Sequence, residues 1–241
     1  MKMRLELDKK ETINIVERLG NAKLKEGSQL FEKYGNLQII KAARLQLNDY
    51  NSLAKRKPGL ALLLVVLSAN RSYSQHVEPH INRIDKDNII VSFSDLKNKM
   101  HDREEFYKYW GHSNLKKYNT LSNLLVQIES VLKLKYSNIT NEYDLINKWG
   151  EEVNLLELEN NPLRIYNFAL ASIQHLRMIF GINTSKPDQR VLEVFKNEFG
   201  VKLNQKNAIL AIEKIADICK CNPLLIDQVF VNYGSGYYLK T

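Results

Sequence analysis

The hydrophobic residues of this chain recur mostly every three or four positions, which is the spacing of one face of an α-helix. The pattern appears at Ile13, Val16 and Leu19, at Leu121, Leu124, Leu125 and Ile128, and at Ala208, Ala211, Ile212 and Ile215. A single β-like run, Ile89-Ile90-Val91, is too short and too isolated to predict a sheet. The pattern therefore predicts an all-α fold of about ten helices.

Two features of the pattern bear on location. The longest apolar run, residues 60–67 (LALLLVVL), is far too short to span a bilayer. The N-terminus, MKMRLELDKK, has no apolar signal region. We therefore expect a cytoplasmic protein without a membrane partner. At the other end, residues 233–238 (YGSGYY) are expected to form a flexible aromatic tail.

Composition and charge narrow the class of partner. The 241 residues are 44% hydrophobic and 26% charged, which is ordinary for a globular protein and excludes a wholly disordered one. The net charge is +8, and it is unevenly spread: +6 over residues 1–59, −2 over 60–163 and +4 over 164–241. Basic ends favour a surface that faces a polyanion such as nucleic acid, although a generally basic protein would show the same total.

The chain offers few metal ligands. Its two cysteines, Cys219 and Cys221, exclude a disulfide framework and a four-cysteine zinc or iron–sulfur site. His76 and His80 have the spacing of two ligands on one helix face, but no third ligand is evident and Pro79 disturbs the helix. We expect no metal and no cofactor.

Three segments follow one another in a characteristic order. Residues 61–70 (ALLLVVLSAN) form an apolar helix that ends in Leu-Ser. Residues 110–117 (WGHSNLKK) form a turn before an amphipathic helix, and residues 176–191 (LRMIFGINTSKPDQRV) combine a helix, Phe-Gly, a loop and Pro-Asp-x-x-Val. In this order and spacing, over about residues 60–232, the chain resembles the helix-hairpin-helix GPD superfamily of DNA glycosylases, the endonuclease III-like group.

This resemblance implies a two-lobed helical DNA glycosylase fold with a cleft between the lobes. Residues 60–183 would form a central helical bundle. Residues 1–59 and 184–241 would form the second lobe, packed with the first as one globular unit. Double-stranded DNA would lie across the cleft.

The catalytic aspartate of that family matches Asp188. An N-glycosidic bond breaks through an oxocarbenium-like sugar, which a nearby carboxylate can stabilise while it orients water. An Asp that follows Pro187 and precedes Val191 is also an ordinary helix N-cap. The two interpretations are compatible, because a helix N-terminus keeps the carboxylate ionised.

The stretch that corresponds to the family's hairpin departs from its pattern. The family reads Leu-Pro-Gly-x-Gly-x-x-Thr-Ala, whereas residues 158–169 read LENNPLRIYNFA, with neither glycine. Asn160 and Asn161 adopt left-handed backbone more readily than most residues, so we expect a modified hairpin that contacts DNA together with Arg164. Bifunctional members carry a lysine in or just after the hairpin, and residues 163–177 contain none. Lyase activity through a Schiff base is therefore not expected.

The resemblance implies further DNA contacts after the apolar helix, at Asn70, Arg71 and Tyr73. Tyr73 could stack on a base or wedge between bases, although these residues also suit a plain polar loop. Lys116 and Lys117 begin a helix, where they could meet phosphates or only solvent.

A base pocket is expected at His175 and Arg177. They are polar residues on a helix that also carries Ile173, Leu176 and Ile179. One face of this helix would pack in the core, and the other could line the groove that receives the base.

These observations together predict a monofunctional DNA N-glycosylase that excises a damaged or modified base in base excision repair. We expect it to act as a monomer on double-stranded DNA. One alternative is a non-catalytic DNA-binding protein on the same scaffold. Another is a glycosylase that acts on modified phage DNA in a defence role.

Overall fold

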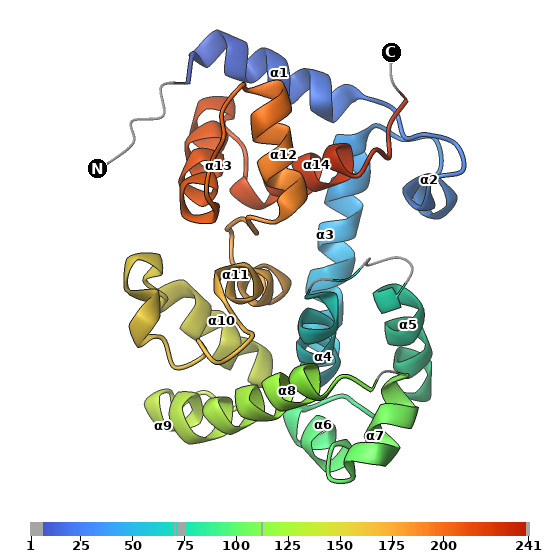
Figure 1. Ribbon diagram of the computed structural model, residues 1–241, viewed down its shortest axis with the longest axis vertical. Coiled ribbons are helices and arrows are strands. Elements are labelled where there is room, and N and C mark those ends of the chain that lie inside the picture. Colours follow the sequence, from blue (N-terminus) through green and yellow to red (C-terminus); the bar gives the residue numbers. More distant parts are fainter. Residues whose placement is uncertain (1–6, 70, 72–75, 112, 240–241) are drawn as a thin grey trace. The chain divides into compact units, whose positions relative to one another are not determined.

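The computed structural model describes residues 7–69, 71, 76–111 and 113–239, apart from the side chains of residues 155, 156 and 159. The fold is all-α, as the periodicity predicts (Figure 1). Among the described residues, β pairing is limited to two isolated bridges, Lys23 with Gln38 and Leu24 with Tyr238. None of the helices in these ranges is both long and apolar enough to cross a membrane.

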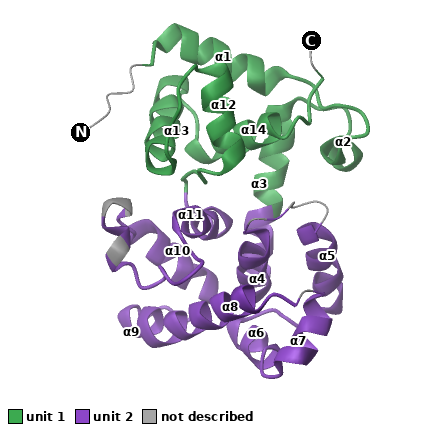
Figure 2. Cartoon of the chain, viewed as in Figure 1, with its two compact units in different colours: residues 1–49, 183–241 green, residues 50–182 purple. Residues whose placement is uncertain are grey.

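The chain divides into two compact units (Figure 2). Unit 1 comprises residues 1–49 and 183–241, and unit 2 comprises residues 50–182. The first boundary falls inside helix α3 (Ile39–Arg56), earlier than the expected division at residues 59 and 60.

This boundary changes the distribution of charge. Unit 1 has 18 basic and 13 acidic residues, a net charge of +5, and unit 2 has 17 and 14, a net charge of +3. The slightly acidic middle segment of the sequence therefore does not correspond to an acidic unit. Both units are basic, because residues 55–57 and Arg164 and Arg177 belong to unit 2.

Unit 1 is built from helices near both ends of the chain. They are α1 (Lys9–Asn21), α2 (Gln29–Tyr34), the first part of α3, α12 (Gln189–Glu198), α13 (Gln205–Cys219) and α14 (Pro223–Gly234). Each of these helices except α3 begins after an Asp, Ser or Asn whose side chain accepts a hydrogen bond from a backbone N–H of the first turn. These capping residues are Asp8, Ser28, Asp188, Asn204 and Asn222. Their apolar faces form one core, which includes Leu19, Ile39, Phe195, Ile212 and Phe230.

The aromatic residues near the C-terminus pack on unit 1, contrary to the expected flexible tail. The rings of Tyr233 and Tyr238 stack with their centroids 4.0 Å apart. The backbone N–H of Lys25 donates to the carbonyl of Tyr237 at 2.9 Å, and that of Leu239 donates to the carbonyl of Lys23 at 3.0 Å. These bonds join the described end of the chain to the segment after α1.

Unit 2 surrounds helix α4 (Pro58–Ser68), whose residues from Gly59 to Ser68 are all buried. The remaining elements are α5 (Glu78–Asp87), α6 (Phe93–Lys99), α7 (Arg103–Trp110), α8 (Leu115–Gln127), the π-helix η2 (Ile128–Leu132), α9 (Lys133–Lys135), α10 (Glu142–Glu152), the 3-10 segment η3 (Leu155–Asn160) and α11 (Leu170–Ile179). Helices α5, α6, α8 and α11 pack directly on α4. A helix that is apolar on every side must be enclosed in this way.

The N-terminus of α4 depends on a glycine. The Gly59 N–H donates to the carbonyl of Val91 at 2.9 Å. A Cβ at position 59 would lie 2.1 Å from the carbonyl oxygen of Ser92, so only glycine allows this approach. The contact also places Ile90 in the core of unit 2, within a segment that forms no strand.

Candidate functional site

Asp188 lies at the N-terminus of α12 in unit 1. Its Oδ1 accepts hydrogen bonds from the backbone N–H groups of Arg190 at 3.0 Å and Val191 at 3.1 Å. The predicted N-cap is therefore confirmed. Its Oδ2 accepts no hydrogen bond from the described residues, and the residue is half-buried. One carboxylate oxygen thus caps the helix.

A second carboxyl group, that of Asp227 on α14, lies close enough to Asp188 to interact with it electrostatically. Asp227 is 1% exposed, and its Oδ1 accepts a hydrogen bond from the Lys186 backbone N–H at 2.9 Å. Its Oδ2 is buried and has no hydrogen-bond partner among the described residues. Burial, and then the charge of Asp188, raise the pKa of Asp227 well above its ordinary value. Burial and the neighbouring Asp188 thus both favour the protonated form of Asp227.

Lys186 completes the group. Burial lowers the pKa of its amino group, and the charges of Asp188 and Asp227 oppose that shift. Helices α12 and α14 pack closely here: a Cβ at Gly234 would lie 2.9 Å from the carbonyl oxygen of Arg190. Two carboxyl groups and an amine thus come together in one part of unit 1. Such groupings of ionisable residues with shifted pKa values are common at functional sites.

The sequence analysis identified Asp188 but missed Asp227. Asp227 lies within the run Leu224-Leu225-Ile226-Asp227-Gln228-Val229-Phe230, where an ionisable residue stands in a mostly apolar segment. That interruption was a usable signal, since a buried carboxyl needs a specific reason. Its proximity to Asp188, across 39 positions of the chain, is a property of the tertiary structure.

In unit 2, Lys117 connects two of the predicted DNA-contact segments. Its Nζ donates to the carbonyl oxygens of Val66 at 3.1 Å, Leu67 at 2.6 Å and Ala69 at 2.7 Å, and so caps the C-terminus of α4. Burial, and then the charge of Arg71, lower its pKa to about 8. Lys117 therefore has a structural role, and we do not retain it as a phosphate contact.

The neighbouring basic residues stay candidates for DNA contact. Lys116 is exposed, and Arg71 is half-buried close to Lys117. Arg71 and Arg83 also lower the pKa of His80, after the larger effect of burial. The structure therefore gathers positive charge near the end of α4. Asn70 and Tyr73 lie outside the described residues.

The segment that corresponds to the hairpin does not adopt the expected backbone. Asn160 ends η3, and neither Asn160 nor Asn161 has a positive φ; in this segment that conformation occurs at Asn167, with φ 64°. The side chain of Asn161 is used internally, because its Oδ1 accepts from Trp149 Nε1 at 3.3 Å and from the Leu163 N–H at 3.0 Å. The two asparagines therefore do not replace the family's glycines, and Arg164 is exposed on the following turn.

The two predicted base-pocket residues differ in their environment. Arg177 is buried; its Nε donates to the carbonyl of Gly150 at 2.9 Å, and its Nη1 donates to Gln174 Oε1 at 2.6 Å. It ties α11 to α10, and we do not retain it as a base contact. His175 is half-buried on the same helix and stays a candidate.

Metal ligands do not gather in the described parts of the chain, where no three His, Cys, Asp or Glu side chains form a group that could hold an ion. Cys219 and Cys221 are free thiols. Comparison of the chain with protein-family models, with curated proteins and with solved structures gives no match.

The first prediction concerns the protonation of Asp227. A carboxyl whose pKa is raised by folding favours the folded state only at low pH, and this contribution is lost as the pH rises through the folded-state pKa. Asp227→Asn keeps the acceptor for Lys186 and is neutral at every pH. We expect the variant to melt higher than the parent at pH 8, by at least about 3 °C, the shift that about 1 kcal/mol gives in a chain of this size.

The difference in melting temperature should shrink as the pH falls towards 3.8, the ordinary pKa of an aspartate, where about half of the unfolded carboxyl is protonated. Thermal melts from pH 4 to pH 8 measure it. Asp217→Asn, at an exposed position of α13, serves as the matched control. A difference that does not depend on pH would mean that Asp227 is ionised in the folded protein.

A second prediction separates the two adjacent lysines. Lys117→Met leaves the carbonyls at the end of α4 without their donor, so we expect a loss of about 1–3 kcal/mol in the free energy of unfolding. Lys116→Met, at an exposed position, should cost less than about 0.5 kcal/mol. Urea unfolding of both variants gives the comparison, and equal stabilities would refute the capping role of Lys117.

Proposed function

We propose that this chain is a monofunctional DNA N-glycosylase that releases a damaged or modified base from double-stranded DNA. The observation that carries the proposal is the Asp188 carboxylate. Its position matches the catalytic aspartate of the helix-hairpin-helix GPD superfamily, which the sequence resembles. In addition, the buried carboxyl group of Asp227 lies close enough to Asp188 to interact with it electrostatically.

Release of the base requires one negative charge close to the sugar. When the bond between C1′ and the base nitrogen breaks, the base leaves with the electron pair and the sugar becomes positively charged. Asp188 would stabilise that charge and orient the water that adds to C1′, whose proton passes to Asp188 or to solvent. Because burial favours the protonated form of Asp227, this residue contributes little negative charge beside Asp188.

DNA contact would come from basic residues of both units. In unit 2, Arg71 and Lys116 lie near the end of α4, and Arg164 is exposed after η3. The net charges of +5 and +3 would favour the approach of a polyanion to either unit. The target base would have to leave the stack to reach Asp188.

A non-catalytic DNA-binding protein is the second candidate, and one observation favours it. In the glycosylase family, two glycines let backbone N–H groups of the hairpin approach a phosphate, and here the corresponding asparagines have ordinary negative φ angles. A chain that has lost this phosphate contact could bind DNA without positioning it for base release.

The decisive variant is Asp188→Asn. Asparagine caps a helix nearly as well as aspartate, so stability should change by less than about 1 kcal/mol. The negative charge is lost, so base release should fall by about a hundredfold or more. Single-turnover excision is measured on duplexes that each carry one damaged or modified base, phage-type modifications included. Abasic sites are then cleaved with alkali.

Glu193→Gln removes a carboxylate from the exposed face of the same helix and should excise at the parental rate. Strand breaks should appear only after alkali, since a monofunctional enzyme leaves the abasic strand intact. If the parent binds these duplexes but releases no base from any of them, the non-catalytic alternative holds.

A further prediction concerns salt. Each phosphate that a basic residue neutralises releases counterions, so a plot of log affinity against log salt should fall with a slope of about −0.9 for each contact. Lys116→Met should reduce the steepness of the slope by about one contact and weaken binding to all duplex sequences alike. Fluorescence anisotropy between 50 and 200 mM salt measures both effects. Over this range, the affinity of a protein that makes several phosphate contacts falls by orders of magnitude. An affinity independent of salt would exclude a DNA-facing surface.

A further inference from the structure

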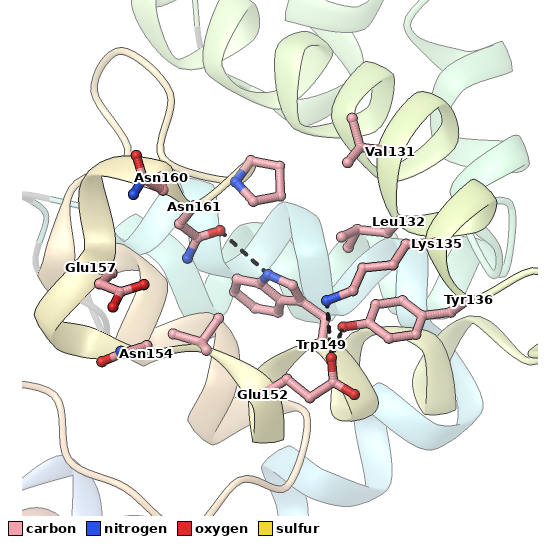
Figure 3. Close-up of a pocket in the computed structure, with 12 residues that line it drawn as sticks. Val131, Leu132, Lys135, Tyr136, Trp149, Glu152, Asn154, Glu157, Asn160 and Asn161 are labelled. Carbon is pink, nitrogen blue, oxygen red and sulfur yellow. Dashed lines mark hydrogen bonds and ion pairs between the residues drawn. The ribbon is translucent and has the colours of Figure 1, made fainter.

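A pocket of about 460 Å³ opens in unit 2 between the end of α10, the segment η3, and η2 with α9 (Figure 3). Its volume lies within the range of sites that bind small organic molecules. One wall includes Val131 and Leu132 of η2, a π-helix, and such distortions are frequent at functional sites. Asp188 belongs to unit 1 and is not one of the residues that line this pocket.

The floor of the pocket is apolar and fixed. Trp149 lies at the centre of the lining residues in Figure 3, with Leu132 beside it, and Pro162 also lines the pocket. The hydrogen bond from Trp149 Nε1 to Asn161 Oδ1 holds the indole in place, and the Leu163 N–H holds Asn161 in turn. A rigid apolar floor suits a flat ring system, which loses little conformational entropy when it binds.

One side of the rim carries a group of ion pairs around Glu152. The Glu152 carboxylate accepts from Tyr136 Oη at 2.5 Å and from Lys135 Nζ at 3.0 Å, and it pairs with Lys148 Nζ at 3.4 Å. The hydrogen bonds from Tyr136 and then Lys135 lower the pKa of Glu152 to about 2. Two lysines around one carboxylate leave a net positive charge on this side, where Lys135 is 58% exposed.

The other side of the rim carries groups that are free to bind. Glu157 and Asn160 are both exposed, and Figure 3 shows them across Trp149 from Lys135 and Tyr136. Neither side chain has a hydrogen-bond partner among the described residues. The pocket thus offers an unpaired carboxylate next to an amide, above an apolar floor and opposite a lysine.

This combination matches the edge of one nucleobase. Guanine presents two adjacent donors, N1–H and N2–H, which a single carboxylate accepts with both oxygens. Its neighbouring O6 is an acceptor for an amide N–H. The other bases each place an acceptor, either a carbonyl oxygen or a ring nitrogen, next to their single donor group. A carboxylate therefore fits the edges of these bases less well. We propose that this pocket binds a guanine base, with Glu157 and Asn160 on its edge and Lys135 towards the phosphate.

The test uses the full chain and guanosine monophosphate in a calorimetric titration. Binding at one site per chain is expected, with adenosine and cytidine monophosphates weaker. Glu157→Gln keeps the size of the side chain and loses the charged acceptor, so affinity should fall by roughly ten- to a hundredfold. Glu151→Gln, an exposed carboxylate of α10 outside the pocket, is the matched control and should bind like the parent.

A second arm distinguishes a free nucleotide from a base in a strand. A thymidine oligomer with one central guanine is titrated in the same way, and the same oligomer without guanine is the control. The proposal is supported if either ligand binds in a guanine-dependent way and Glu157→Gln weakens that binding. The ligand that binds more tightly identifies the source of the base. No saturable binding in either arm, or equal effects of Glu157→Gln and Glu151→Gln, would overturn it. Asn160→Asp, which would repel O6, gives an independent check if Glu157→Gln melts below the parent. These readouts do not involve base excision, so failure of the glycosylase proposal would leave them unchanged.

Discussion

The enclosure of α4 is the constraint on which unit 2 depends. Because this helix is apolar on all sides, helices α5, α6, α8 and α11 must cover it, and both of its ends must be satisfied inside the protein. Gly59 allows the start of the helix to meet the carbonyl of Val91, and Lys117 supplies donors to the carbonyls at its end. The capping amine also brings the start of α8 to the segment after α4. The positive charge near the end of α4 is therefore a consequence of how this helix is buried.

Unit 1 shows a different compromise between stability and chemistry. Asp188 serves the helix with one oxygen and leaves the other unoccupied by the described residues. Asp227, wholly buried nearby, has an oxygen with no hydrogen-bond partner there, an arrangement that costs free energy unless the group is neutral. Folds retain such costs mainly where ionisable groups with different pKa values are useful. Two neighbouring carboxyl groups in different environments are the kind of pair that acid–base chemistry uses.

The segment from Glu152 to Leu163 differs in its backbone from the hairpin of the glycosylase family that the sequence resembles. The residues that stand where the family has glycines neither adopt the glycine conformation nor form a ring of free N–H donors. Asn161 instead fixes Trp149 through its side chain, and Trp149 forms the floor of a pocket. The difference from the family's hairpin and the floor of the pocket lie in the same few residues. Unit 2 can therefore have a binding property that the resemblance does not include.

The sequence by itself determined the all-α class, because helical periodicity and capping residues are local properties that each segment carries alone. For the same reason it located the start of α12 at Asp188 and the absence of a strand at Ile89-Ile90-Val91. It also predicted two units, but it placed the first boundary too late, since no local signal marks a division within the continuous helix α3.

The roles of individual charged residues were decided only by the tertiary structure. Lys116 and Lys117 are equivalent in the sequence, yet one is exposed and the other caps a helix about 50 positions away. Asp227 becomes part of the candidate site, and Arg177 becomes part of the core, through partners on other elements. The physical reason is that burial and long-range hydrogen bonds set the protonation and accessibility of a polar group, and neither is encoded by its neighbours along the chain.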